Sequence, residues 1–94
     1  KSYACDITNY EEIKSIINKQ PRIDILINNA AIDFSPDDKN EYIKPFEKFS
    51  NDTWKKVMKV NIDGVYLSCK IIGSRMAKKK RGSIINISSI NLKI

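Results

Sequence analysis

The fold of this chain is decided by the stretch GSIINISS, residues 82–89. Gly82 opens it after a basic segment, and a short run rich in isoleucine then ends on Ser88 and Ser89. A run of this length, enriched in β-branched residues, is typical of a buried strand. Because open α/β proteins bind ligands at the carboxyl ends of their strands, we expect the two serine hydroxyls to lie at a ligand-binding edge.

A second strand is predicted at residues 23–28, where the sequence IDILIN is almost continuously apolar. That pattern is typical of a parallel strand covered on both faces. Two amides and two small residues follow at its carboxyl end: Asn28, Asn29, Ala30 and Ala31. The residues alone leave two interpretations of the amides open, because they can contact a ligand or hydrogen-bond the backbone ends of neighbouring strands.

The region before that strand predicts a helix from about residue 9 to residue 19. Its apolar residues recur at helical spacing: Tyr10, Ile13, Ile16 and Ile17. Thr8 and Glu11 have the spacing of a capping box, and Pro21 ends the helix because the residue before a proline disfavours the α region. Residues 1–9 are expected to hold the end of a strand and a turn, so the whole region forms a βαβ unit.

The longest predicted helix begins with Ser50 as its N-cap and runs to about Arg81. Asn61 lies on the apolar side of this helix, where a polar amide needs hydrogen-bond partners. Gly64 lies in the helix interior, where glycine costs about 1 kcal/mol relative to alanine. The pair therefore indicates either close packing or a local irregularity of the helix.

Composition excludes several classes of protein. The chain has 94 residues, of which 41% are hydrophobic and 30% charged, a balance typical of a globular protein. No apolar run approaches the ~20 residues of a membrane span, and we expect a cytoplasmic protein without a membrane partner. The net charge of +6 includes Lys78–Arg81, which we interpret as complementing a helix dipole, so we expect no nucleic-acid partner.

The chain contains no histidine and two distant cysteines, Cys5 and Cys69. These numbers predict no disulfide framework or metal site, and they exclude a Ser-His-Asp triad within these residues. Residues 32–49 lack helical or strand periodicity and are predicted to form a long loop, a class of segment that is often functional.

Four motifs carry a resemblance to the short-chain dehydrogenase/reductase family. They occur in the family's order and cover essentially the whole chain: CDIT at 5–8, DILINNAA at 24–31, VNIDGVY at 60–66 and GSIINISS at 82–89. The resemblance implies an α/β fold, namely strands three to five of a doubly wound, parallel Rossmann sheet with the intervening helices. Residues 1–94 would then be the central part of a single NAD(P)-binding Rossmann domain, truncated at both ends.

The resemblance also implies a cofactor, NAD or NADP, and the residues that bind it. Asp6 would contact the adenine with the Ile7 backbone nearby, and residues 29–31 would pass beside the ribose. Six positions make up this cofactor-binding set: Asp6, Ile7, Asn29, Ala30, Ala31 and Val60. Asn28 would instead tie strands together. The family's usual glycine is replaced by Ala31.

Two catalytic residues are implied. Asn61 matches the helix asparagine that supports the family's proton relay, and Ser89 matches the serine that hydrogen-bonds the substrate carbonyl or hydroxyl. The interval between them favours Ser89 over Ser88. A serine in that role need not ionise, because it only positions the substrate and stabilises a developing oxyanion.

The function expected from the resemblance is interconversion of a small-molecule carbonyl and a secondary alcohol by hydride transfer. The Gly-rich pyrophosphate turn does not occur in these 94 residues, and no Tyr-x-x-x-Lys pair follows Ser89, where the resemblance implies one, so we expect the chain alone to be inactive. A non-catalytic member that binds a nucleotide or a partner is the alternative, and a small basic nucleic-acid-binding protein is the third. Like the family, the full-length protein is expected to form a homodimer or homotetramer through the helix at 50–81.

Overall fold

The computed structural model describes residues 1–32 and 44–88, and it has two strands and a set of helices. In chain order the elements are α1 (Tyr10–Asn18), β1 (Ile25–Asn28), the short 3-10 helix η2 (Phe46–Lys48), α3 (Asn51–Met58), the π-helical turn η3 (Lys59–Asp63), α4 (Gly64–Lys79) and β2 (Ser83–Asn86). No helix within the described ranges is long and apolar enough to cross a membrane.

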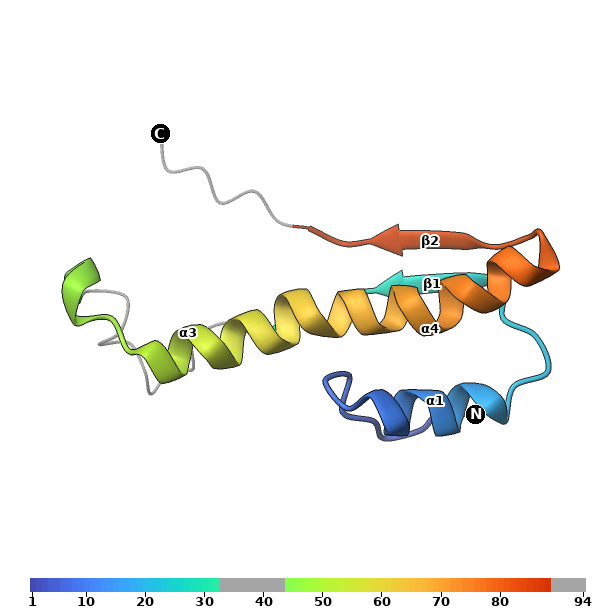
Figure 1. The fold of residues 1–94 in the computed structure, drawn as a ribbon, viewed down its shortest axis with the longest axis horizontal. Helices are drawn as coiled ribbons and strands as arrows, with labels where there is room; N and C mark the ends of the chain where they lie inside the picture. The colour runs from blue at the N-terminus through green and yellow to red at the C-terminus, as the bar shows by residue number, and fades with distance from the viewer. Residues whose placement is uncertain (33–43, 89–94) are drawn as a thin grey trace.

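The two strands lie side by side and pair in parallel (Figure 1). The near-continuous apolar run at 23–28 predicted a parallel strand. Ile25 pairs with Ser83 and Asn28 with Asn86. The hydrogen bonding continues beyond β2, where the Ile87 N–H donates to the Asn28 carbonyl at 3.0 Å. This pairing confirms an α/β arrangement, with strands shorter than the predicted 23–28 and 83–89. Residues 1–6 belong to no strand, so the strand end expected there is not formed.

Helix α4 packs against both strands, and α1 packs against α4 (Figure 1). Three apolar side chains are buried among the described residues: Ile13, Ile72 and Met76. Two expectations of burial are wrong for the described residues, since the strand at 23–28 is not covered on both faces and β2, expected to be buried, is exposed at every position. Ile25 and Ile27 are 60% and 58% exposed, because α4 covers the opposite side of the sheet and no described element covers theirs.

The start of α1 differs from the predicted capping box. Asn9, rather than Thr8, is the N-cap, and its side chain accepts a hydrogen bond from the Glu12 N–H at 3.1 Å. The Thr8 hydroxyl donates to Asp6 Oδ1 at 2.7 Å instead. Together with the Thr8 N–H, which donates to the same oxygen, this contact holds Thr8 in the turn one residue before the N-cap position. An asparagine is as good an N-cap as a threonine, so the helix loses nothing.

The long helix begins as predicted, because the Ser50 side chain accepts a hydrogen bond from the Thr53 N–H at 3.3 Å. It is not one continuous α-helix, since η3 interrupts it and the Gly64 N–H reaches back five residues to the Lys59 carbonyl. Both interpretations of the Asn61 and Gly64 pair are therefore correct. The helix is irregular there, and Gly64 packs closely against Ile7.

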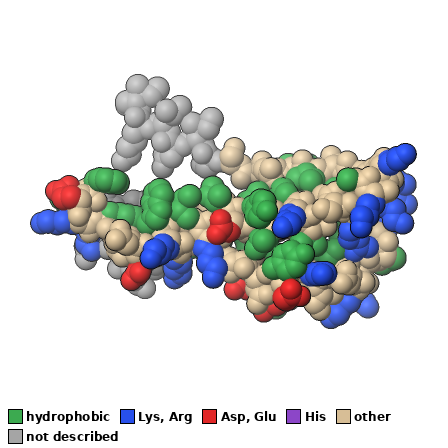
Figure 2. All heavy atoms as spheres, viewed as in Figure 1, with side chains coloured by type: hydrophobic (Ala, Val, Ile, Leu, Met, Phe, Trp, Pro, Cys, Tyr) green, Lys and Arg blue, Asp and Glu red, His purple; other side chains and the backbone are tan. Residues whose placement is uncertain are grey.

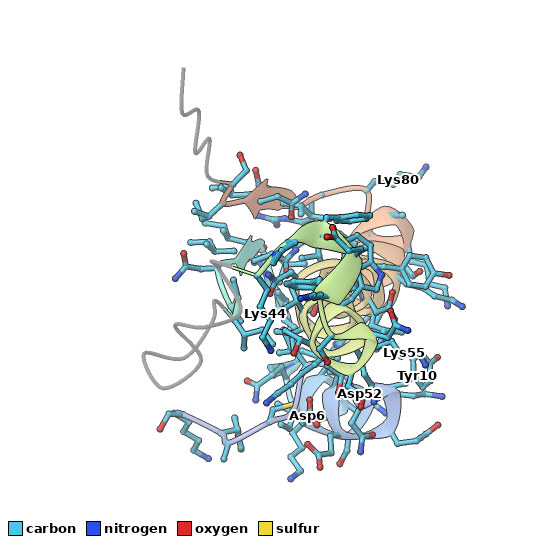
Figure 3. The ribbon with its side chains drawn as sticks, turned by 90° about the vertical axis from the view of Figure 1, so that its left-hand side faces the viewer. Asp6, Tyr10, Lys44, Asp52, Lys55 and Lys80 are labelled. Carbon is cyan, nitrogen blue, oxygen red and sulfur yellow. The ribbon has the colours of Figure 1, made fainter. Side chains whose placement is uncertain are left out.

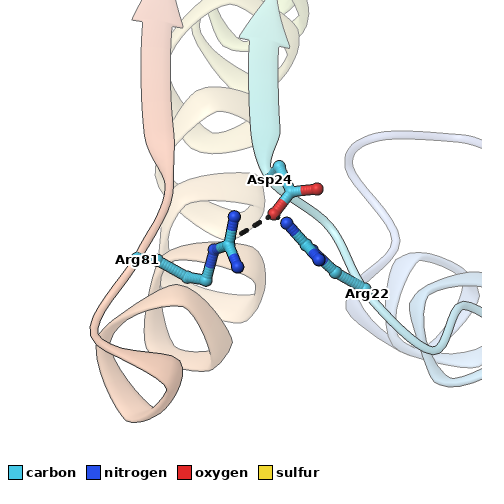
Figure 4. A network of polar contacts seen from close by, with 3 residues as sticks. All are labelled: Arg22, Asp24 and Arg81. Atoms are coloured by element: carbon cyan, nitrogen blue, oxygen red, sulfur yellow. Dashed lines mark hydrogen bonds and ion pairs between the residues drawn. The ribbon is translucent and has the colours of Figure 1, made fainter.

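The end of α4 uses its basic residues in an unexpected way. Lys80 itself adopts the left-handed conformation at the helix end, with φ of 55°, and Gly82 follows with φ of 144°. Arg81 then pairs with Asp24 at 3.5 Å, beside Arg22, which pairs with the same carboxylate at 2.7 Å (Figure 4). The segment after the helix is thus linked to the start of β1.

A further basic side chain, that of Arg75, joins α4 to α1. Arg75 of α4 donates to the Gln20 carbonyl at 2.7 Å and to the Ile17 carbonyl, both at the carboxyl end of α1. Helix α1 has no basic residue in its own last turn, so Arg75 supplies the positive charge that such an end favours. A hollow of about 220 Å³ lies beside Arg75 and Asp24. The guanidinium groups of the arginines that line it already make these structural contacts.

Candidate functional site

The carboxyl end of β1 opens into a small hollow of about 160 Å³. Its lining includes three residues of the predicted cofactor-binding set: Ile7, Asn29 and Ala30. The rest of the lining comes from the two elements that meet there, with Leu26, Ile27 and Asn28 from β1 and Val65 and Ser68 from α4. Residues distant in sequence therefore converge at the sheet edge where the strand pattern places a ligand.

Asp6 lies in a tight turn that leads into α1. Its carboxylate accepts two hydrogen bonds from Thr8, one from the hydroxyl at 2.7 Å and one from the backbone N–H at 2.9 Å. Its own N–H donates to Glu12 Oε2 at 2.8 Å, so both sides of the turn are fixed. Figure 3 shows Asp6 on the α1 side of the long helix, whereas Lys80 lies beside the strands.

The same contacts keep Asp6 ionised. Donation from the Thr8 hydroxyl, and then from its N–H, lowers the pKa of the Asp6 carboxyl, and the charge of Lys59 adds to this effect. The carboxylate is exposed, so its remaining lone pairs can accept hydrogen bonds from a ligand. An amino group such as that of adenine is a donor of the required kind.

The two amides after β1 have different surroundings. Asn28 donates to Asn86 Oδ1 at 2.8 Å and to Cys69 Sγ at 3.4 Å, so it joins both strands to α4. This confirms that Asn28 ties strands together. Asn29 is exposed and makes no hydrogen bond within the described residues, and Ala30 and Ala31 after it are exposed as well. These three residues form an open wall beside the hollow.

Asn61 hydrogen-bonds the backbone of Ile32, the residue that follows Ala31. Its Oδ1 accepts from the Ile32 N–H at 2.8 Å, and its Nδ2 donates to the Ile32 carbonyl at 3.0 Å. The amide thus pairs with a backbone segment as a neighbouring strand would. Both Asn61 and Val60, the last residue of the predicted cofactor set, belong to the turn η3.

Ser89, the predicted catalytic serine, lies outside the described residues, so its position relative to Asn61 stays a prediction. Ser88 is exposed just after β2. Most of the long loop predicted at 32–49 is also outside the described residues, apart from Ile32 and the segment from Lys44, which contains η2.

Two residues at the candidate site were not found from sequence: Ser68, which lines the hollow, and Lys59, which lies outside its lining. Ser68 is buried at 7% exposure, and Lys59 contributes charge to Asp6. Ser68 could have been found from its spacing, because it follows Gly64 by one helical turn and so places a second small residue on the same side of α4. Lys59 had no signal, because its closeness to Asp6 depends on long-range packing.

The cysteines and acidic residues show no other centre in residues 1–32 and 44–88. Cys5 and Cys69 are free, as expected. Desolvation, followed by the charges of Glu12 and Asp6, raises the pKa of the Cys5 thiol, which disfavours the nucleophilic thiolate. No group of three or more His, Cys, Asp or Glu side chains in those ranges is arranged to hold a metal ion.

The geometry defines an α/β chain with a hollow at the carboxyl end of a parallel strand. Residues 1–93 match the short chain dehydrogenase family, and the chain belongs to that family. It is 30% identical over 89 residues to the cyclopentanol dehydrogenase of a Comamonas species, a match covering 90% of this chain and 32% of that relative. The chain thus spans about a third of the length of the curated relatives it matches.

Solved structures agree with this assignment. A structure described as ElxO with NADP bound superposes with a TM-score of 0.78 at 33% identity, covering 93% of this chain and 34% of that one. A 3-oxoacyl-[acyl-carrier protein] reductase from Brucella melitensis with bound NAD gives a TM-score of 0.78 at 28% identity, covering 92% and 32%. The elements described above therefore have the arrangement found in these larger proteins.

Proposed function

We propose that the whole protein is an NAD(P)-dependent oxidoreductase that interconverts a carbonyl and a secondary alcohol. Residues 1–94 would form strands three to five, with their helices, of its single Rossmann domain. The observation that carries this proposal is the convergence of Ile7, Asn29 and Ala30 on one hollow, within a chain of the short chain dehydrogenase family.

The surroundings of the hollow fit one end of a dinucleotide. The exposed, ionised Asp6 is an acceptor for the adenine amino group, and Asn29 has an unused amide for the ribose hydroxyls. Ala30 and Ala31 are small enough for a close approach, and Val60 would supply apolar contact on the adenosine side. The bound dinucleotide would supply the hydride donor or acceptor, which no side chain of the chain can provide.

The proposed catalytic residues have different tasks. Ser89 would donate a hydrogen bond to the oxygen of the reacting carbonyl or alcohol, where negative charge develops. Asn61 has both ends of its amide engaged by Ile32. Its contribution to the proton relay would therefore come from its position in η3 and from holding the segment beside the hollow.

The test is an assay of the complete protein that contains this chain, with NADH or NADPH and a panel of carbonyl compounds. The relatives direct the panel toward cyclic ketones and 3-oxoacyl thioesters. We expect oxidation of one reduced cofactor that depends on the carbonyl compound, and no turnover from the 94 residues alone. Tight dinucleotide binding without turnover on the panel would favour the non-catalytic alternative.

We also propose that the complete protein is a homodimer or homotetramer through the long helix. Three large side chains of α3, η3 and α4 stay more than half exposed: Trp54, Ile62 and Tyr66. Figure 2 shows hydrophobic side chains along this helix, where a second copy would cover them. No stripe of similar size lies exposed on α1, whose largest exposed apolar residue is Tyr10 at 37%.

Replacing Ile62 by glutamate is expected to shift the complete protein toward monomers, because a charge would be buried between copies. Light scattering coupled to size exclusion would measure the mass. Glu11→Lys on the exposed side of α1 is the control and should leave the mass unchanged. An Ile62→Glu protein with the parent's mass would contradict this interface.

A further inference from the structure

Gly64 lies where the long helix packs against Ile7 of the Asp6 turn. It is the first residue of α4, directly after η3, and it is buried. A Cβ at this position would lie 2.7 Å from Ile7 Cδ1 and 3.0 Å from Ile7 Cγ1. Carbon atoms in van der Waals contact lie about 3.5–4.0 Å apart, so any larger residue would displace Ile7.

Ile7 has two ways to move, and both change the hollow. Its side chain lines the hollow together with Asn29 and Ala30, so rotating Cδ1 away from the helix would partly fill that space. A β-branched side chain also has few alternative rotamers. The other way is a shift of the backbone, which would move Asp6 and its carboxylate.

The backbone around Ile7 resists such a shift. The hydrogen bonds from Thr8 and to Glu12 fix Asp6, and the Asn9 N–H donates to the Asp6 carbonyl at 3.0 Å. The turn is therefore a rigid body whose distance from the long helix is set by the contact between Ile7 and Gly64. A larger residue at position 64 would increase the distance between Ile7 and the helix, and would therefore move the whole turn away from the hollow.

The opposite wall of the hollow is held from the same part of the helix. Asn61, three residues before Gly64, pairs with the backbone of Ile32 just beyond Ala31. One helical segment, η3 and the start of α4, thus fixes both walls. Gly64 sets the position of the Asp6 turn, and Asn61 sets the position of residues 29–32.

We propose that Gly64 is a positioning residue for the adenosine end of the dinucleotide, because it alone lets Ile7 pack against the helix and keeps the hollow open. This inference rests on the proposed function, and it assigns to Gly64 a role in binding that does not involve contact with the cofactor. Alanine suits a helix better than glycine does, but at this buried position its methyl group would clash with Ile7, so the gain for the helix is opposed by strain at the contact.

The test compares Gly64→Ala with Gly73→Ala in the complete protein. Gly73 is also in α4, but a Cβ there would lie 3.4 Å from Ile84 Cδ1, at the edge of ordinary contact. Inhibition by AMP, which carries the adenosine end, and by nicotinamide mononucleotide, which carries the other end, separates the two halves of the cofactor site. We expect Gly64→Ala to weaken AMP about tenfold and to raise the dinucleotide KM similarly, with kcat and mononucleotide inhibition within about twofold of the parent.

A compensating variant decides whether Ile7 transmits the effect. Ile7→Val removes Cδ1, the atom nearest to the added methyl group, so Ile7→Val with Gly64→Ala should regain most of the AMP affinity. Three results would overturn the role of Gly64. They are an equal loss of affinity for AMP and nicotinamide mononucleotide in Gly64→Ala, the same loss of AMP affinity in Gly73→Ala, and no recovery of AMP affinity when Ile7→Val is added to Gly64→Ala. A parent protein that binds neither AMP nor a dinucleotide would instead overturn the proposed function, and with it this inference.

Discussion

Replacing Ser89 by alanine in the complete protein is expected to lower kcat by roughly 10²–10³-fold while the dinucleotide affinity stays nearly unchanged. The hydroxyl is proposed to stabilise charge that develops on the substrate oxygen, and a donor of this kind acts mainly in the transition state. Its loss should therefore reduce kcat and kcat/KM together. Steady-state kinetics with the best carbonyl substrate, and titration of the dinucleotide without substrate, measure the two quantities.

Ser88→Ala is the matched control for this prediction. Ser88 is the same residue type one position earlier, and in the strand that the sequence predicts over 83–89 successive side chains would point to opposite sides. We expect its kcat to remain within about threefold of the parent. Equal activity of Ser89→Ala and parent, or a large loss confined to Ser88→Ala, would refute the assignment of Ser89.

The sequence predicted the features that depend on local pattern. The near-continuous apolar run at 23–28 predicted a parallel strand and the isoleucine-rich run at 83–89 predicted a second strand, and β1 and β2 form within these runs and pair in parallel. Ser50 was identified as an N-cap because capping needs only a side chain and a backbone three residues later. The fold class was readable because both strands and the long helix carry strong periodic signals.

The sequence did not predict the features that depend on contacts outside the local pattern. The capping box at Thr8 was wrong because the helix begins one residue later, with Asn9 as its N-cap. Both interpretations of Asn61 and Gly64 proved correct because η3 combines a wide turn with close packing. The partner of Asn61 is the backbone of Ile32, which carries no side-chain signal. The prediction that the strand at 23–28 is covered on both faces was wrong because the described helices lie on one side of the strands.

Asn61→Leu is expected to lower the free energy of unfolding of the complete protein by about 2–3 kcal/mol, since a side chain of similar size can neither accept from nor donate to Ile32. The Ile32 N–H and carbonyl would lose their partners in a partly buried site. The dinucleotide KM should also rise, because residues 29–31 are no longer held beside the hollow. Urea unfolding and steady-state kinetics measure the two effects. Asn51→Leu, at an exposed position at the start of α3, should cost less than about 0.5 kcal/mol.

Asn61→Asp separates the hydrogen bonds from the shape of the side chain. Its carboxylate could still accept from the Ile32 N–H, but its second oxygen would face the Ile32 carbonyl, and this repulsion raises the carboxyl pKa in the folded state. A protonated carboxyl can both accept and donate, as the amide does. The variant's stability relative to the parent should therefore improve as the pH falls toward the carboxyl pKa and worsen as the pH rises above it. A deficit of Asn61→Asp that does not change between about pH 4 and pH 7 would contradict the clamp on Ile32 as the reason for an amide at this position.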